Sequence, residues 1–478
     1  MAACGAESKR TGDETDARRP LRICFISSQV YGLFHPSSGL PVGGAEVQIA
    51  SLARELSRDP QFEIVILTGD GTRSAREREG AITVVLDPLY AAPRAYRQDG
   101  THASAAEARG LTMWERMKER GQRYVRQCPS PLATAMRAVV RGGYACRRWA
   151  KSVPPVLAVL QKIREGRRAF RWFRLFRSIR ADVYVTRCAS AQVKNMQTAC
   201  SLLRRPFVYM VAHEMDVSGE YTRANPTAGK LFEEGLRRAD AIVCQHGGQA
   251  ELLRARYARD AQVVRSICPS PVRSGAAESK KAILWIARSD SWKQPELFMD
   301  LVGRLPNESF VMVSPLSQME PEILSGLKAR AERMANLRFM ERVPFGETAA
   351  LFDEAKVFVN TSKWEGFPNT FLQAAACGTP IVSWAVNPDD VLDRYHFGLC
   401  AHGDTARLEE LVRLVCADDA LRAELGRQGQ RYVREHHDPA VVAGQFADLC
   451  RSLTCGHAAS RGRSCGSVHE VRGSLTVQ

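Results

Sequence analysis

Residues 364–383 read WEGFPNTFLQAAACGTPIVS and follow the apolar run AKVFVN at 355–360. The β-branched and aromatic residues of that run predict a buried strand. A Gly/Pro loop comes next, and then a helix that Thr370 can cap, with Gln373 at the capping-box spacing. The helix ends at Gly378, and PIVSW begins another strand. The stretch therefore predicts strand, loop, helix and strand, the pattern of an α/β fold.

The loop of this stretch lies where open α/β sheets bind ligands, at the carboxyl end of a strand. The helix start offers unpaired backbone N–H groups to an anion. Glu365 places a carboxylate beside them. This combination indicates a ligand with both phosphates and hydroxyl groups, although an ordinary charged loop explains the stretch alone equally well.

Strands and helices alternate along most of the chain, which predicts parallel sheets covered on both faces. The pattern starts at LRICFISS (21–28) and starts again at KAILWIARSD (281–290), so we predict two Rossmann-like domains that face each other across a cleft. The expected divisions are a disordered leader at 1–20, an N-terminal domain at 21–266 with a basic insertion at about 89–150, a linker at 267–280, a C-terminal domain at 281–455 and a disordered tail at 456–478.

Composition sets the broad class of the protein. The chain has 478 residues, more than one core holds, and its 45% hydrophobic content suits globular domains. The 14 cysteines show no paired spacing, which favours reduced thiols in a cytosolic protein. The start of the chain has no apolar segment typical of a signal peptide, and no apolar run approaches the roughly 18 residues of a membrane span. We therefore expect a cytoplasmic protein, attached at most peripherally to the inner face of the cell membrane.

The positive charge is concentrated in one region. The whole chain carries a net charge of +15, whereas residues 91–180 alone hold 21 Lys and Arg against 5 Asp and Glu, a balance of +16. The rest of the chain is therefore close to neutral, at −1. Such a local excess favours an anionic partner, such as an anionic membrane, an acidic glycan or nucleic acid.

The segment AFRWFRLFRSIR at 169–180 predicts a helix with one apolar face. That face is formed by Trp172, Leu175, Phe176 and Ile179, with Arg171, Arg174 and Arg177 beside it. We favour a helix that packs on the sheet and leaves its arginines in water. Contact of the arginines with anionic lipid is the alternative.

Four segments, in this order, resemble the retaining nucleotide-sugar glycosyltransferases of family 4, which have the GT-B fold of two facing Rossmann-like domains. They are GGAE (43–46), ADAIVCQHGGQAELL (239–253), ARSDSWKQPELFMDL (287–301) and the stretch at 364–383. The resemblance implies that a nucleotide-diphosphate sugar donates its sugar to a glycan or lipid-linked acceptor, in cell-surface polysaccharide or glycoconjugate synthesis. It also implies retention by a same-face mechanism without a protein nucleophile.

The resemblance assigns four catalytic residues. Arg288 and Lys293 contact the diphosphate, whose negative charge grows as the sugar becomes oxocarbenium-like. Glu365 accepts hydrogen bonds from hydroxyl groups of the donor sugar, and His213 lies near the reacting sugar. Solvated charges for the first two and a buried structural histidine for the last are the alternatives. Glu214 and Asp216 are further candidates for binding an acceptor.

The substrate-binding set implied by the resemblance lies in two loops. Gly43 and Gly44 let the backbone approach the phosphates, because a Cβ would obstruct contact. The second loop, at 366–373, reaches the sugar or phosphate with its backbone N–H groups, except at its proline, which has no N–H. Gln373 replaces the acidic residue that holds the ribose in relatives, and capping is its alternative role. The second loop contributes Gly366, Phe367, Pro368, Asn369, Thr370 and Gln373.

We see no Asp-x-Asp motif to hold a metal on the diphosphate, so we expect no metal and no cofactor beyond the nucleotide-diphosphate sugar itself. Two other functions compete. A catalytically degenerate GT-B scaffold is hinted at by Gln373 alone. A nucleic-acid-binding protein would use the basic insertion, but that insertion has no recognisable binding motif, and we do not expect nucleic acid as a partner.

Overall fold

The computed structural model describes residues 19–35, 42–69, 74–87, 154–270, 272, 280–317 and 320–459. The basic insertion predicted at 89–150 lies outside the described residues. So do residues 1–18 of the predicted leader and 460–478 of the predicted tail.

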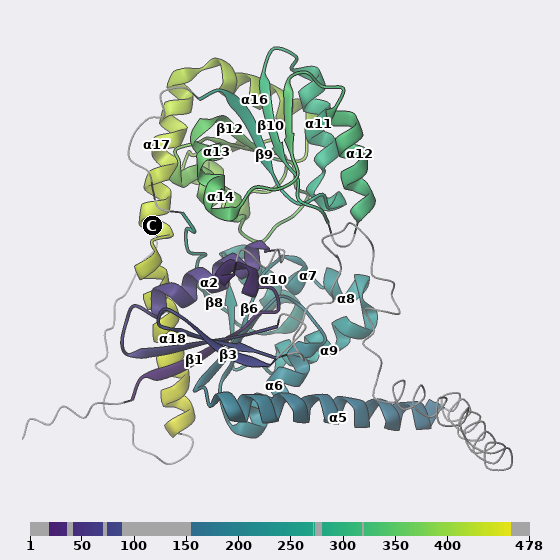
Figure 1. Ribbon diagram of the computed structural model, residues 1–478, viewed down its shortest axis with the longest axis vertical. Coiled ribbons are helices and arrows are strands. Elements are labelled where there is room, and N and C mark those ends of the chain that lie inside the picture. Colours follow the sequence, from purple (N-terminus) through teal and green to yellow (C-terminus); the bar gives the residue numbers. More distant parts are fainter. Residues whose placement is uncertain are drawn as a thin grey trace, which may run out of the picture.

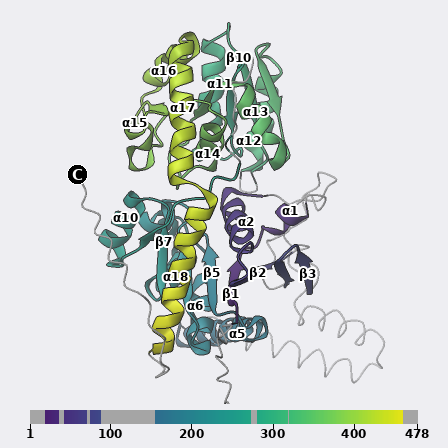
Figure 2. The same cartoon turned by 90° about the vertical axis from the view of Figure 1, so that its left-hand side faces the viewer.

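The described part of the first domain is built on an eight-stranded sheet with the order β3-β4-β2-β1-β5-β6-β7-β8 (Figures 1 and 2). Its strands are β1 Leu21–Ile26, β2 Phe62–Thr68, β3 Ala75–Glu79, β4 Ile82–Leu86, β5 Val183–Arg187, β6 Phe207–Met210, β7 Ala241–Cys244 and β8 Gln262–Val263. The ladders are parallel except that β3 pairs antiparallel with β4. We did not predict β3, because its sequence ARERE is charged and lacks the apolar run of a buried strand.

Helices cover both faces of this first sheet. They are α1 Tyr31–Phe34, α2 Gly44–Leu56, α5 Pro154–Ile179, α6 Gln192–Leu203, α7 Met215–Ser218, α8 Glu220–Ala224, α9 Pro226–Arg237 and α10 Gly247–Tyr257. Side chains alternate along each strand. Ile23 and Phe25 of β1 therefore join the core under α2. Cys24 and Ile26 join the opposite core under α5, α6 and α9.

Helix α5 presents its apolar face to the sheet, which confirms the expected packing, whereas contact of its arginines with anionic lipid stays untested. Trp172, Phe176 and Ile179 are buried in the second of these cores, and Leu175 is half-buried against it. The arginines beside that face are exposed: Arg171, Arg174 and Arg177. Among the helices that the structure describes, neither α5 nor any other is long and apolar enough to cross a membrane.

The second domain is built on a six-stranded parallel sheet with the order β11-β10-β9-β12-β13-β14. Its strands are β9 Ala282–Ile286, β10 Ser309–Val313, β11 Leu337–Met340, β12 Ala355–Asn360, β13 Ile381–Ser383 and β14 Gly398–Cys400. Its helices are α11 Pro295–Arg304, α12 Pro321–Ala331, α13 Thr348–Glu354, α14 Asn369–Ala376, α15 Val391–Arg394, α16 Thr405–Ala417 and α17 Asp419–His436. Short 3-10 turns lie at η3 Ser291–Lys293, η4 Phe345–Glu347 and η5 Pro388–Asp390. Helices α11, α12 and α16 pack on one face, and α13, α14 and α17 on the other.

The last helix, α18 Pro439–Ala459, returns to the first domain (Figure 2). Val442, Phe446 and Cys450 join the core that lies under α2, and the Phe446 ring stacks on Phe25 at a centroid distance of 5.8 Å. The expectation that the second domain runs to residue 455 was therefore wrong. An apolar helical pattern does not tell which of two sheets the helix covers. Residues 456–459, which we assigned to the tail, continue α18.

The chain crosses between the domains twice, and the two crossings touch at His437. Its Nδ1 lies 2.6 Å from the carbonyl oxygen of Ser266, at the end of the first domain, and its Nε2 lies 3.1 Å from the Tyr432 hydroxyl. The Cys268 N–H donates to the carbonyl of His437 at 3.1 Å. Burial of the ring lowers the pKa of His437 to about 3, so the imidazole is neutral at physiological pH.

His437 is expected to make the stability of the protein depend on pH. Its pKa is lowered from 6.5 to about 3 on folding, so the unfolded chain binds more protons between these values. The stabilisation is complete above pH 6.5 and is lost as the pH falls, by about 2 kcal/mol at pH 5. Urea unfolding of the wild type and of His437→Gln, at pH 7.5 and pH 5, measures this. We expect the wild type to lose about 2 kcal/mol more than the variant, and an equal loss in both proteins would contradict the assignment.

Candidate functional site

The loops at the carboxyl ends of the two sheets meet between the domains. From the first domain come the loop after β6, which holds His213, and the segment after β7, which leads into α10. From the second come the loop between β12 and α14 and the turn η5 after β13. Hydrogen bonds join these loops across the junction. Open α/β sheets bind their ligands at this edge.

Lys293 and Glu365 form an ion pair on the second-domain side of the junction. Both side chains are largely buried, with exposed fractions of 14% and 12%. The hydroxyl of Ser362 donates to the same carboxylate at 2.8 Å, and the Lys293 ammonium lies 3.9 Å from the centre of the Trp292 ring. A charge pair in such a poorly solvated place interacts more strongly than one at the surface. The η3 turn and the loop after β12 thus place the two predicted catalytic residues in direct contact.

His213 reaches the same place from the first domain. Its ring meets Trp292 edge-on at a centroid distance of 5.2 Å. The N–H of Met215 donates to Nδ1 at 3.2 Å, so a neutral ring carries its hydrogen on Nε2. That Nε2 is buried and has no hydrogen-bond partner in the part of the chain that the structure describes. Burial lowers the pKa of His213 and outweighs the opposing charges of Glu365 and Asp216, so the ring is a neutral donor.

Arg288 completes the set of four predicted catalytic residues. Its half-exposed guanidinium pairs with the buried carboxylate of Asp290 at 3.0 Å. Burial lowers the pKa of Lys293, Glu365 opposes this, and the charge of Arg288 acts in the same direction as burial. The charge of Arg288 also lowers the pKa of His213. The structure therefore brings Arg288, Lys293, Glu365 and His213 within electrostatic reach of one another.

The loop at Gly366 touches the first domain closely. The N–H of Phe367 donates to Oε1 of Gln245 at 3.1 Å, across the junction. Contact of this N–H with a sugar or phosphate stays a prediction, and the ligand would have to replace its bond to Gln245. A Cβ on Gly366 would lie 2.2 Å from the same Gln245 oxygen and 2.6 Å from the carbonyl oxygen of Ala212. Gly366 is required by the contact between the two domains.

Helix α14 begins at Asn369, with Pro368 as its N-cap residue. Thr370 was expected to cap the helix, and that expectation was wrong, because Thr370 already lies inside the first turn. The first-turn N–H groups of Asn369 and Thr370 have no partner within the helix, and their contact with a substrate stays a prediction. The Asn369 side chain joins the domains: Oδ1 accepts from Gln48 Nε2 and Nδ2 donates to the Gly44 carbonyl, both at 2.8 Å.

Gln373 is buried on the core side of α14. Its Nε2 donates to the hydroxyl of Thr348 at 2.9 Å. The capping-box role is wrong, because the helix starts two residues earlier than expected and places Gln373 five residues after the N-cap, beyond the three of a capping box. The contact with a ribose stays a prediction, and the amide would have to leave or share its bond to Thr348.

The glycine pair lies at the start of α2, with Gly43 as the N-cap residue. The Gly43 N–H donates to the carboxylate of Glu46 at 3.1 Å, and burial raises the pKa of that carboxyl. A Cβ on Gly44 would lie 3.0 Å from the Asn369 amide nitrogen, so this glycine allows the domains to approach. Contact of Gly43 and Gly44 with a phosphate stays a prediction. We had not assigned a role to Glu46, although its spacing of three residues from Gly43 is a capping signal.

Asp389 forms a further contact between the domains that the sequence did not reveal. Its carboxylate accepts from the N–H groups of Gly247 and Gly248, at 2.7 and 2.8 Å, and lies 3.1 Å from Nδ1 of His246. Burial raises the pKa of Asp389, but these three contacts outweigh it and hold the pKa below its usual value. More than 140 residues separate the partners, so no local pattern could have indicated the contact.

Asp216 was one of the two carboxylates that we considered for binding an acceptor. It has a structural role, because it is buried and accepts a hydrogen bond from the Tyr209 hydroxyl.

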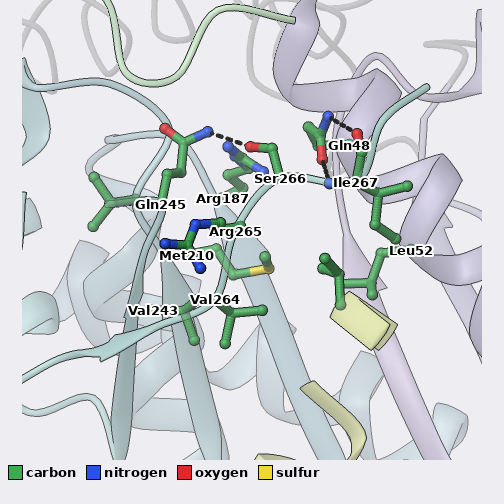
Figure 3. Close-up of a pocket in the computed structure, with 12 residues that line it drawn as sticks. Gln48, Leu52, Arg187, Met210, Val243, Gln245, Val264, Arg265, Ser266 and Ile267 are labelled. Carbon is green, nitrogen blue, oxygen red and sulfur yellow. Dashed lines mark hydrogen bonds between the residues drawn. The ribbon is translucent and has the colours of Figure 1, made fainter. Parts of the chain in front are cut away.

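A small cavity lies beneath the junction, and Figure 3 shows its lining. Gln48, Gln245 and Ser266 border it, together with Arg187, whose Nε is buried without a partner among the residues that the structure describes. Its volume of about 10 Å³ has room for one water molecule. The cavity is therefore too small for a nucleotide sugar.

No group of three or more His, Cys, Asp or Glu side chains in the described ranges is placed to hold a metal ion. The absence of a metal from the reaction stays a prediction.

Residues 280–418 match the model of the family described as "Glycosyl transferases group 1". Among curated proteins, the chain is 25% identical over 272 residues to D-inositol 3-phosphate glycosyltransferase of Segniliparus rotundus, a match that covers 51% of this chain and 58% of that protein. It is 27% identical over 146 residues to alpha-maltose-1-phosphate synthase of Mycobacterium tuberculosis, covering 28% of this chain and 38% of that protein. The matches thus span less than two thirds of these relatives.

Solved structures match over most of the chain. Sucrose-phosphate synthase from Thermosynechococcus elongatus has a TM-score of 0.62 at 15% identity, with 91% of this chain and 100% of that chain covered. Anabaena HepE in complex with UDP and glucose has a TM-score of 0.56 at 13% identity, with 90% and 100% covered. The chain has the GT-B fold that we predicted. The family model and the curated relatives thus show that the chain is similar to group 1 glycosyltransferases.

Because the domains touch so closely at Gly366, we expect that adding one methyl group at this position pushes them apart. In Gly366→Ala the new Cβ meets the backbone carbonyl of Ala212, which cannot move as a side-chain end can. Gly346→Ala is the control, because a Cβ at Gly346 has no atom within 4 Å. Small-angle X-ray scattering measures the separation. We expect a larger radius of gyration for Gly366→Ala alone, and identical scattering from both variants would refute the account.

Proposed function

We propose that the protein is a retaining glycosyltransferase of family 4, which transfers a sugar from a nucleotide-diphosphate sugar to a glycan or lipid-linked acceptor. One observation carries the proposal: Arg288, Lys293 and Glu365 gather at the carboxyl edge of the second sheet, and His213 faces them from the first domain. The GT-B fold alone does not establish an activity, because a fold hosts many functions. The residues of this junction supply the chemistry.

On the donor side, two cations stabilise the leaving diphosphate. As the bond between the anomeric carbon and the phosphate oxygen breaks, negative charge grows on the diphosphate. The ammonium of Lys293 is already fixed beside Glu365, so it needs little reorganisation to meet that charge. Arg288 adds a half-exposed planar guanidinium that can bind two phosphate oxygens at once.

Glu365 and His213 hold the sugar between the domains. The Glu365 carboxylate accepts from sugar hydroxyl groups, and Ser362 fixes its orientation from behind. His213 contributes a neutral Nε2–H that has no other partner in the described structure. Its donated hydrogen bond suits a hydroxyl of the donor sugar or of the acceptor.

The junction fits retention of configuration by a same-face mechanism. The acceptor hydroxyl attacks from the face that the diphosphate leaves, and its proton passes to a departing phosphate oxygen. The new bond to the acceptor oxygen thus replaces the bond to phosphate without a protein nucleophile. We further infer a role in the synthesis of cell-surface polysaccharide or glycoconjugate.

A thermal-shift panel of UDP-, GDP- and ADP-sugars tests donor binding. UDP-glucose comes first, because Anabaena HepE of the same fold binds UDP and glucose. Arg288→Ala is compared with Arg304→Ala, which removes a similarly exposed arginine whose ion pair with Glu409 lies elsewhere. We expect a shift with at least one donor that Arg288→Ala loses and Arg304→Ala keeps. The absence of a shift with every donor would refute the proposal and favour the degenerate scaffold.

Transfer should depend on both members of the ion pair. We expect Glu365→Ala to abolish transfer with the fold intact, and Lys293→Ala to reduce it at least tenfold, because a lost charged contact of about 1.5–3 kcal/mol corresponds to that or more. The control is Lys356→Ala, which removes an ion pair with Glu308 in the same domain. Release of nucleoside diphosphate in the presence of acceptor is the measurement. Wild-type rates in Glu365→Ala or Lys293→Ala would remove that residue from the mechanism.

A further inference from the structure

The outer face of α5 carries an uncompensated positive charge. Residues 166–180 include no Asp or Glu, and six of their arginines are exposed. None of the six forms an ion pair within the described part of the chain. We define the α5 basic face as Arg167, Arg168, Arg171, Arg174, Arg177 and Arg180 together with Phe170.

A large apolar side chain lies among these arginines. Phe170 is 58% exposed, and its ring stacks on that of the half-buried Phe173 at a centroid distance of 6.2 Å. Successive residues of a helix are turned by about 100°, which places Phe170 between Arg177 and Arg174 on the arc opposite the buried stripe. The aromatic ring thus lies within the charged surface, toward the side on which Phe173 is half-buried.

The basic face is positioned away from the candidate site. Helix α5 lies along the outer edge of the first domain, at the bottom of Figure 1, whereas the second domain lies at the top. With 26 residues it is about 39 Å long. A partner that covers this face would leave the junction between the domains open.

We propose that the α5 basic face binds the surface of an anionic membrane. Clusters of four to eight Lys and Arg on a helix are attracted to anionic lipids, and an exposed aromatic ring can enter the headgroup region. A straight, convex helix suits a flat surface better than it suits a nucleic-acid strand, which is held in a groove. Apart from its arginines, which can contact guanine or phosphate, the face has none of the Asn, Gln or Glu side chains that read the other bases.

Membrane binding would indicate the class of acceptor that the proposed glycosyltransferase uses. If the acceptor is lipid-linked, the α5 basic face holds the first domain at the surface that carries it. This consequence rests on the proposed function, whereas membrane binding itself does not. The two are tested by separate measurements, because donor binding is read from the thermal-shift panel.

The test is sedimentation of the full chain with vesicles, either of phosphatidylcholine alone or with 30% phosphatidylglycerol. The variant Arg171→Glu/Arg174→Glu/Arg177→Glu reverses the centre of the face. The control Arg427→Glu/Arg431→Glu/Arg434→Glu makes the same change in net charge on exposed positions of α17. Each arginine near an anionic surface contributes about a fivefold gain in binding.

We expect the wild type and the α17 variant to bind the anionic vesicles and not the neutral ones, less tightly as salt increases. The α5 variant should bind at least a hundredfold less, and Phe170→Ser several-fold less, with melting temperatures close to that of the wild type. Equal binding by the α5 and α17 variants would overturn the proposal, as would no binding by the wild type. Tighter binding of a single-stranded oligonucleotide, lost in the same α5 variant, would also overturn it in favour of nucleic acid.

Discussion

The structure depends on one close contact, in which the N–H of Phe367 donates to the Gln245 side chain across the junction of the two domains. Only a glycine at 366 allows it, because a Cβ would meet the Ala212 carbonyl. The contacts of Asn369 and Asp389 lie on the same junction. Together they hold the carboxyl edges of two parallel sheets face to face, where ligands bind in folds of this kind.

That contact also explains the electrostatics of the candidate site. With the domains together, Lys293, Glu365 and His213 lose most of their water. Burial lowers the pKa of Lys293, and the charge of Glu365 opposes this, so the ammonium depends on Glu365 to stay charged. A diphosphate that takes over this pairing would meet the same positive charge. Binding of a charged ligand is therefore coupled to the contact between the domains. A diphosphate that lies between the domains replaces some of the interactions that Glu365 makes when no ligand is bound.

The sequence predicted the two Rossmann-like domains, because most of their strands are uninterrupted apolar runs. It also placed the candidate site in the loops that follow those strands. It did not predict β3, because that strand is charged. It also did not predict that α18 returns to the first domain, because an amphipathic pattern does not show which sheet a helix packs on. The helix cap was predicted at Thr370, two residues after the observed N-cap Pro368. The cross-domain roles of Gln245 and Asp389 depend on partners more than 120 residues away. No local propensity encodes such pairs.

The most direct test of the central claim is hydrogen–deuterium exchange with and without a saturating nucleotide sugar. We expect slower exchange in two separate stretches, residues 288–293 with 361–371 in the second domain and residues 211–217 in the first. Protection of the second domain alone would show that the domains do not close on the donor together. Protection confined to regions away from this junction would contradict the account.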